Sequence, residues 1–90
     1  MKITEIKIRK TEVSPKLRAV VSVTFDDEFV VHDIKVIDGG DRLFLAMPSR
    51  RLPDGTFCDI AHPVSAALRK TLEQRVTEAF LNAKGGDGED

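Results

Sequence analysis

Apolar and polar residues alternate along the first part of the chain, with the period of two that is typical of half-buried β-strands. The alternation spans 2–11 and is clearest over 17–25, and it resumes over 28–37 after the acidic pair Asp26 and Asp27. Acidic residues at this point favour a tight turn. We therefore predict a strand over 2–11, followed by a long hairpin formed by 17–25 and 28–37.

The two apolar rows of the second hairpin strand predict how its faces are used. Phe29 and Val31 alternate onto one side, and the other side receives Val30, His32, Ile34 and Val36. The hairpin is then apolar on both faces, and one helix can cover only one of them. A second copy of the chain would cover the other face, so we expect a homodimer. His32 lies on an apolar row, and we expect a packed, hydrogen-bonded core histidine there.

The middle of the chain predicts two shorter strands around a loop. The apolar run 43–47 stops at Pro48, because proline cannot donate a ladder hydrogen bond. The segment 48–56 is expected to be an ordered loop, closed by a turn at 53–55. We predict that 56–60 then returns as a strand that pairs with 43–47.

Apolar residues recur every three or four positions after Pro63, which predicts one amphipathic helix as far as about Asn82. Pro63 suits the first helical position, and Ser65 is a competing N-cap. Gly85 and Gly86 are expected to end the helix. The fold class is therefore α+β, with a four- to five-stranded antiparallel sheet and a C-terminal amphipathic helix.

The composition is that of one small folded domain, with 41% hydrophobic and 32% charged residues among 90. We expect 1–84 to form this domain and the acidic, glycine-rich segment 85–90 to be disordered. No apolar run approaches the ~18 residues of a membrane span, and the N-terminus lacks the apolar stretch of a signal peptide. We therefore expect a cytoplasmic protein with no membrane partner. Its single cysteine, Cys58, excludes an intramolecular disulfide.

Charge is distributed unevenly behind a formal net charge of −1. Residues 1–24 hold six basic and two acidic residues, whereas 25–41 hold one basic and six acidic residues. Residues 42–84 hold seven basic and four acidic residues. A basic surface can therefore coexist with a nearly neutral total, and the charge neither requires nor excludes a polyanionic partner.

The most specific candidate site is the pair Arg50 and Arg51, on the loop that prolines bracket. The planar guanidinium fork suits phosphate or the edge of guanine, and a stiff loop loses little entropy on binding. The alternative is that both are solvated arginines paired with nearby acids such as Asp54 and Asp59. These two residues alone favour the solvated interpretation, because surface charges are common, and their position on a loop strengthens the case for binding.

Two further basic elements are candidates for contacts with a polyanion. Lys7 and Arg9 project from one strand face, and Arg69 and Lys70 lie on the predicted helix. The alternative is that they serve only solubility and protection of a sheet edge. The chain has no Trp or Tyr, and its five Phe residues lie mostly in core-like positions, which disfavours a protein that stacks single-stranded bases on its sheet.

Residue types for catalysis or metal binding are present, but no recognised spacing joins them. His32, His62, Cys58 and Asp59 match no ligand or nucleophile motif. An enzyme would require a pocket that gathers both histidines and Cys58. We therefore expect no enzymatic activity, no catalytic residue, no metal, no cofactor and no small-molecule substrate.

Four strings of this chain resemble the bacterial stage V sporulation protein G (SpoVG) family, also called septation regulators. The longest is VVSVTFDDEFVVHDIKVI at 20–37, and the others are MPSRR at 47–51, PDG at 53–55 and DIAHPV at 59–64. The likeness covers residues 1 to about 83 without a sizeable gap. Only the acidic tail falls outside it.

This resemblance implies a homodimeric antiparallel sheet with a C-terminal helix, acting as a sequence-preferring nucleic-acid-binding regulator. The implied partner is DNA, with RNA as a second candidate, and the implied role is in septation, sporulation and surface or virulence gene expression. The basic pair after Met-Pro-Ser, here Arg50 and Arg51, belongs to the binding region of the family. In that region the family usually has lysine in place of Arg50, commonly threonine in place of Leu52, and frequently a basic residue in place of Cys58. The alternative function is a non-catalytic protein-interaction module.

Overall fold

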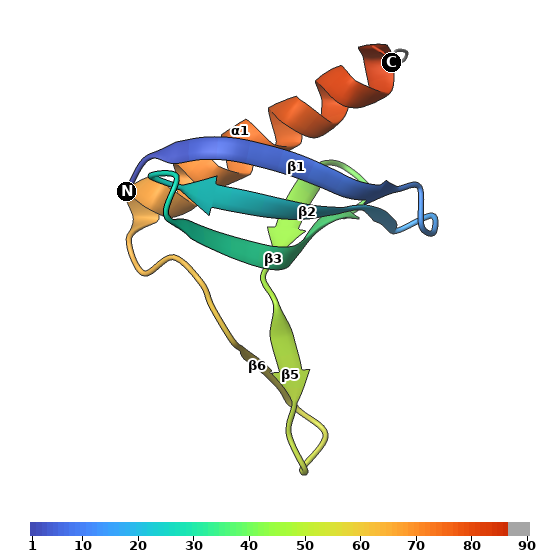
Figure 1. Cartoon of the computed structure of the whole chain (residues 1–90). Coiled ribbons are helices and arrows are strands. Elements are labelled where there is room, and N and C mark those ends of the chain that lie inside the picture. Colours follow the sequence, from blue (N-terminus) through green and yellow to red (C-terminus); the bar gives the residue numbers. More distant parts are fainter. Residues whose placement is uncertain (87–90) are drawn as a thin grey trace.

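Residues 1–86, the part of the chain that this computed structural model describes, form an antiparallel sheet, a small hairpin and one helix. The four strands of the sheet lie in the order β1 (Ile3–Thr11), β2 (Leu17–Phe25), β3 (Phe29–Asp38) and β4 (Leu43–Ala46). The hairpin pairs β5 (Ser49–Arg51) with β6 (Phe57–Asp59), and the helix is α1 (Ala66–Gly86). The predicted α+β class is therefore confirmed. Figure 1 shows α1 along one face of the sheet and the hairpin projecting away from it.

The hydrophobic core lies between α1 and one face of the sheet. Alternate residues of β2 from Ala19 to Phe25 are buried there, as the alternation predicts. Three helix residues spaced four apart, which therefore share one face of α1, pack onto this row: Leu72, Val76 and Phe80. We call the opposite face of the sheet, turned away from α1, the outer face.

Strand β3 contains a β-bulge that its alternation pattern does not reveal. Val23 pairs with Val31 whereas Val21 pairs with Ile34, so two steps along β2 match three steps along β3. The extra length lies around Asp33, whose φ of 62° is left-handed. Aspartate tolerates that conformation better than most residues do. The bulge therefore reverses which side chains point toward the core and which point away from it in the rest of the strand.

Two expectations about β3 are wrong because of this shift. Ile34 and Val36, expected on the face opposite the β2 core row, are buried in the core. His32, expected to be packed in the core, is exposed on the outer face, where its Nδ1 lies 2.8 Å from Ser22 Oγ. The outer face is therefore more polar than predicted, and it no longer supplies the reason for covering it with a second copy.

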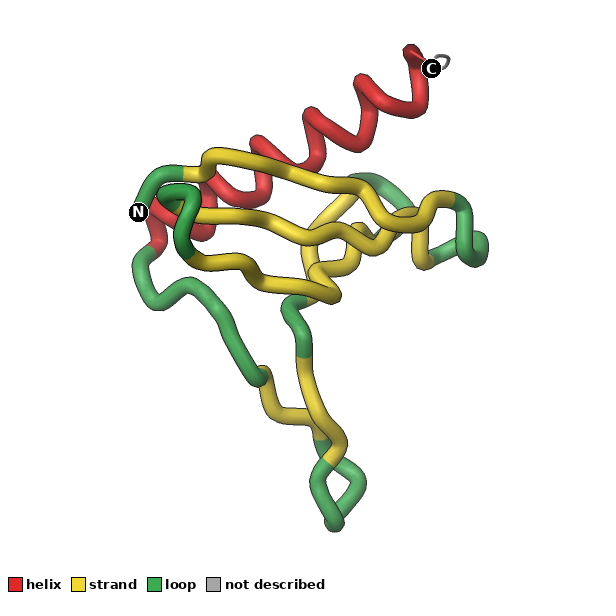
Figure 2. Tube along the Cα trace, viewed as in Figure 1, coloured by secondary structure: helices red, strands yellow, loops and turns green. Residues whose placement is uncertain are grey.

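Strands β5 and β6 pair with each other and not with the main sheet. The expectation that 56–60 pairs with 43–47 is wrong, and part of the expected loop 48–56 is strand β5. Pro48 ends β4 because it has no backbone N–H, and the turn at 53–55 brings its two flanking segments together. We call residues 48–60 the arm. Figure 2 shows the loops that join the arm to β4 at one end and, through a longer path, to α1 at the other.

Helix α1 begins after Ser65 and runs further than its apolar pattern predicts. The Ser65 hydroxyl accepts the Leu68 backbone N–H at 3.0 Å, so Ser65 is the N-terminal cap, and Pro63 precedes the helix and is not its first residue. The helix continues past Asn82 to Gly86. The segment expected to be disordered was 85–90: its first two residues belong to α1, which corrects that expectation, and 87–90 lie outside the described residues.

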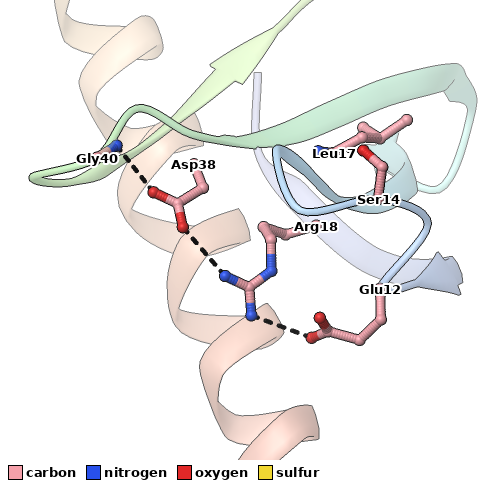
Figure 3. Close-up of polar contacts among 6 residues, drawn as sticks. All are labelled: Glu12, Ser14, Leu17, Arg18, Asp38 and Gly40. Atoms are coloured by element: carbon pink, nitrogen blue, oxygen red, sulfur yellow. Dashed lines mark hydrogen bonds and ion pairs between the residues drawn. The ribbon is translucent and has the colours of Figure 1, made fainter.

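Arg18 of β2 links the ends of three strands (Figure 3). Its guanidinium contacts Glu12, just after β1, at 3.2 Å and Asp38, at the end of β3, at 3.1 Å. The hydrogen bond that Arg18 donates to Glu12, and next the negative charge of Glu12 and the contacts with Asp38, raise the pKa of Arg18 above its ordinary value. Asp38 also accepts the Gly40 backbone N–H at 2.8 Å. Arg18 therefore has a structural role and is not a candidate for binding a ligand.

Candidate nucleic-acid interface

The arm carries Arg50 and Arg51 into solvent. Both side chains are exposed, and in register Arg50 lies opposite Cys58 while Arg51 lies opposite Phe57. Adjacent strand residues point to opposite faces, so each arginine occupies a different face of the arm. Neither arginine takes part in an ion pair found in the described part of the chain, so neither guanidinium group is neutralised by a nearby acid there.

The turn at the tip of the arm is held by its own polar contacts. Asp54 Oδ1 accepts the Thr56 hydroxyl at 2.7 Å and the Thr56 backbone N–H at 3.0 Å. These two hydrogen bonds, with the hydroxyl first, lower the pKa of Asp54 below its ordinary value. Gly55 adopts a φ of 93°, which glycine permits without strain. The acid nearest to the arginines in sequence therefore stabilises the turn and does not pair with them.

A broad groove of about 760 Å³ lies on the outer face, beside the base of the arm. Its basic residues are Arg9 and Lys10 of β1 and Lys35 of β3, and Asp33 is its acidic residue. The remaining residues of its lining are Val20, Ser22, His32, Pro48, Ser49 and Ile60. Lys7 of β1 lies on the same face, because it is paired with Ser22. The predicted residues Lys7 and Arg9 are thus both placed on the outer face, and Arg9 lines the groove together with residues of the arm.

The predicted residues Arg69 and Lys70 lie on another part of the molecule. They belong to the first turns of α1, which packs on the core face of the sheet. Both are exposed, and the Arg69 guanidinium donates to the Pro63 carbonyl oxygen at 3.5 Å. The structure therefore places the helix pair on the layer opposite the groove.

Side chains suited to catalysis are dispersed in the structure. His32 lines the outer groove, and His62 lines a separate apolar pocket, with its Nδ1 3.1 Å from the Pro63 carbonyl oxygen. Cys58 is exposed on the arm and lines neither cavity. In the described part of the chain, no three His, Cys, Asp or Glu residues are grouped so that they could hold a metal ion. No helix among residues 1–86 is long and apolar enough to cross a membrane.

The groove contains residues that were not predicted for the site, among them His32, Lys35 and Lys10. An alternation that continues through Asp33 without a bulge predicts His32 on the same side of β3 as core residues. Lys35 carried a usable signal, because it lies between two β-branched apolar residues and a strand residue between two buried neighbours points outward.

These features define the class to which the protein belongs: a small α+β domain whose exposed basic side chains gather on a projecting arm and on an open groove of the sheet. The family model SpoVG matches residues 1–82. The chain is 54% identical over 84 residues to the "Putative septation protein SpoVG" of Caldanaerobacter subterraneus subsp. tengcongensis, covering 93% of this chain and 92% of that protein. The protein therefore belongs to the SpoVG family, as its sequence motifs predict.

Other relatives of the same name support this assignment. The identity to the protein of Agathobacter rectalis is 55% over 80 residues, covering 89% of this chain and 92% of the relative. The identity to the protein of Acetivibrio thermocellus is 51% over 89 residues, covering 99% and 95% respectively. The likeness therefore extends over the arm, the groove and the helix, and is not confined to one motif.

Proposed function

We propose that this protein is a nucleic-acid-binding regulator that acts in septation and sporulation, with duplex DNA as its first partner. The observation that carries the proposal is the arm, a two-stranded ribbon that projects from the domain with Arg50 and Arg51 exposed and without an acidic partner among residues 1–86. The association with septation rests on the name that the relatives bear.

The shape of the arm favours B-form DNA over duplex RNA. The major groove of B-DNA is about 12 Å wide and admits a two-stranded β-ribbon, whereas the major groove of A-form RNA is too narrow for side chains to read. Arg50 and Arg51 would face opposite walls of such a groove, where guanidinium groups bind phosphates or guanine edges. Cys58 lies opposite Arg50, so this face of the arm has one cation where the family frequently has two.

Binding assays with three polyanions test this proposal directly. Fluorescence anisotropy would compare random duplex DNA, single-stranded DNA and duplex RNA over a range of salt concentrations. We expect the tightest binding to duplex DNA, and a log-linear loss of affinity with salt, with a slope of about −0.9 for each phosphate contacted. A protein that binds none of the three at low salt would overturn the proposal.

Replacement of Arg50 and Arg51 by alanine should remove most of the affinity for duplex DNA while leaving the fold intact, because both side chains are exposed. The matched control is Arg42→Ala with Arg75→Ala, which removes two exposed arginines outside the arm and changes the net charge equally. If both double variants lose the same affinity, the effect is one of net charge and the arm is not the site. Loss of cooperative unfolding would instead show that the arm arginines are structural.

Exposed apolar side chains favour an additional role in self-association. Phe57, Ile60 and Val64 are 70%, 66% and 93% exposed, and they lie on β6 and the segment that follows it. The same chain has an open apolar pocket of about 110 Å³, with Phe29 and Leu68 in its lining. One copy thus offers both apolar projections and a recess, and we propose that a second copy covers them in a homodimer.

The alternative function, a protein-interaction module without nucleic-acid contact, would use the same apolar side chains. Salt separates the two functions, because binding through phosphates weakens steeply with salt and an apolar protein interface does not. An interaction module would also keep its partner after replacement of Arg50 and Arg51.

A further inference from the structure

Ser22 is the polar residue that is buried within the described part of the chain, and its partner is a histidine. The Ser22 hydroxyl oxygen lies 2.8 Å from His32 Nδ1, across the pair of strands β2 and β3. Among residues 1–86 this hydroxyl has no second hydrogen-bonding partner. A buried hydroxyl group donates its proton, so Nδ1 accepts it, and the neutral ring carries its own proton on Nε2.

The bulge at Asp33 turns this ring outward, so the Nε2–H group is available to a ligand in the outer groove. His32 itself is exposed and lines the groove, while Ser22 beneath it is 4% exposed. The ring is therefore held from below by one hydrogen bond and offers its other nitrogen to the solvent side. This arrangement orients a donor without burying it.

The charged groups around His32 come from two strands. Strand β1 contributes Arg9 and Lys10, and β3 contributes Lys35 and the acidic residue Asp33. The lining from β2 is not titratable, and the base of the arm contributes the neutral Ser49 hydroxyl. Three cations against one carboxylate make the groove a site for an anion.

The size and position of the groove indicate an extended anion. It is an open space of about 760 Å³, much larger than one phosphate ion needs, and its lining continues into Pro48, Ser49 and Ile60 of the arm. A polymer that contacts the arm would therefore pass over the groove. A phosphodiester backbone has the required charge and length.

We propose that the outer groove binds a backbone phosphate of the nucleic acid, that His32 Nε2–H donates to this phosphate, and that binding is coupled to protonation of His32. This inference rests on the proposed function. The added proton goes to Nδ1, which then donates to Ser22 Oγ while the hydroxyl group turns its own proton away from the ring. The ring thereby gains one positive charge beside the phosphate, and a charge-assisted hydrogen bond is about twice as strong as a neutral one. Affinity for duplex DNA should therefore be higher at a pH at which a histidine ring is charged than at a pH at which it is neutral.

The test measures the affinity for random duplex DNA at about pH 5.5 and about pH 8, at one ionic strength, around the usual titration range of histidine. The wild-type protein should bind about five- to tenfold more tightly at the lower pH. His32→Gln keeps a neutral donor but cannot gain a charge, so it should lose this difference. His62→Gln is the matched control, because His62 lines a different cavity, and it should keep the difference.

A second measurement follows the His32 ring by NMR, with and without duplex DNA. Linkage requires that, if protonation tightens binding, DNA must move the titration of the ring to higher pH by the same factor. An unchanged ring titration overturns the inference, as does a His32→Gln variant that keeps the full pH response. If the wild-type protein binds no nucleic acid at either pH, the proposed function falls and the inference falls with it.

Discussion

Deletion of Asp33 tests whether the bulge in β3 determines which residues enter the core. Val23 pairs with Val31 and Val21 pairs with Ile34, so β3 has one more residue than β2 between these pairs, and Asp33 is the extra residue. Without it, one half of β3 must reverse its faces, because a slip of one residue sends every side chain to the other side of the sheet.

Both ways of accommodating the deletion are costly. If the second half reverses, Ile34 and Val36 leave the core, where they are 1% and 0% exposed. Exposure of two such side chains costs about 3–6 kcal/mol. If the first half reverses, His32 turns toward the core and the Ser22 hydroxyl loses its partner, and two buried unpaired polar groups cost about 2–6 kcal/mol. We therefore expect a loss of about 2–3 kcal/mol or more, a large part of the 5–15 kcal/mol that stabilises a typical domain.

Circular dichroism during thermal unfolding provides the assay. A loss of about 3 kcal/mol corresponds to a fall in Tm of about 12–24 °C for a domain of this size. Asp33→Gly is the matched control, because it keeps the bulge and glycine accepts the φ of 62°, so its stability should stay within about 1 kcal/mol of wild type. A deletion variant whose Tm falls by less than about 5 °C would refute the reasoning.

Two further predictions concern the tip of the arm and self-association. Asp54 should titrate below 3.8, its ordinary value, when followed through the Thr56 amide chemical shift, because hydrogen bonds from Thr56 stabilise its charged form. Its contribution to the turn is therefore present above the unfolded pKa and lost as the pH falls through the folded pKa, whereas a midpoint at or above 3.8 would contradict the turn geometry. Sedimentation should give a particle of about twice 10.0 kDa, and Phe57→Ser should shift it toward the monomer. A wild-type particle of 10.0 kDa at micromolar concentration would contradict the proposed dimer.

The strands of the main sheet could be predicted closely where alternation is unbroken. The bounds predicted for β2, 17–25, are those observed, because each of its inward positions is apolar. The sequence could not predict which residues of β3 face the core. The facing depends on how β3 pairs with β2, and the adjacent residues Val30 and Val31 are apolar and suit either face. The strand that pairs with β6 could not be predicted for a related reason. A strand of three residues is too short for its alternation to indicate a partner, and the adjacent turn determines that it pairs with β5.

The candidate site was predictable only where local chemistry marks it. Flanking prolines and a turn motif place Arg50 and Arg51 on an exposed element, although the pattern did not show that this element is a β-ribbon. His32 carries no such mark, because its exposure depends on a bulge that changes the register between β3 and its neighbour β2. The wrong assignment of His32 to the core thus removed it from the predicted site.

The separation of the arm from the core has a consequence for how this chain can change. All arm residues from Ser49 to Ile60 are exposed except Leu52, which is half-buried, so substitutions there leave the packing between sheet and helix untouched. Selection for stability alone would therefore place little restriction on which side chains this segment carries. The close-packed four-stranded sheet, in contrast, tolerates few changes of side-chain size. The arm can therefore be randomised in a library on an intact scaffold, and any preference that emerges reports recognition and not folding.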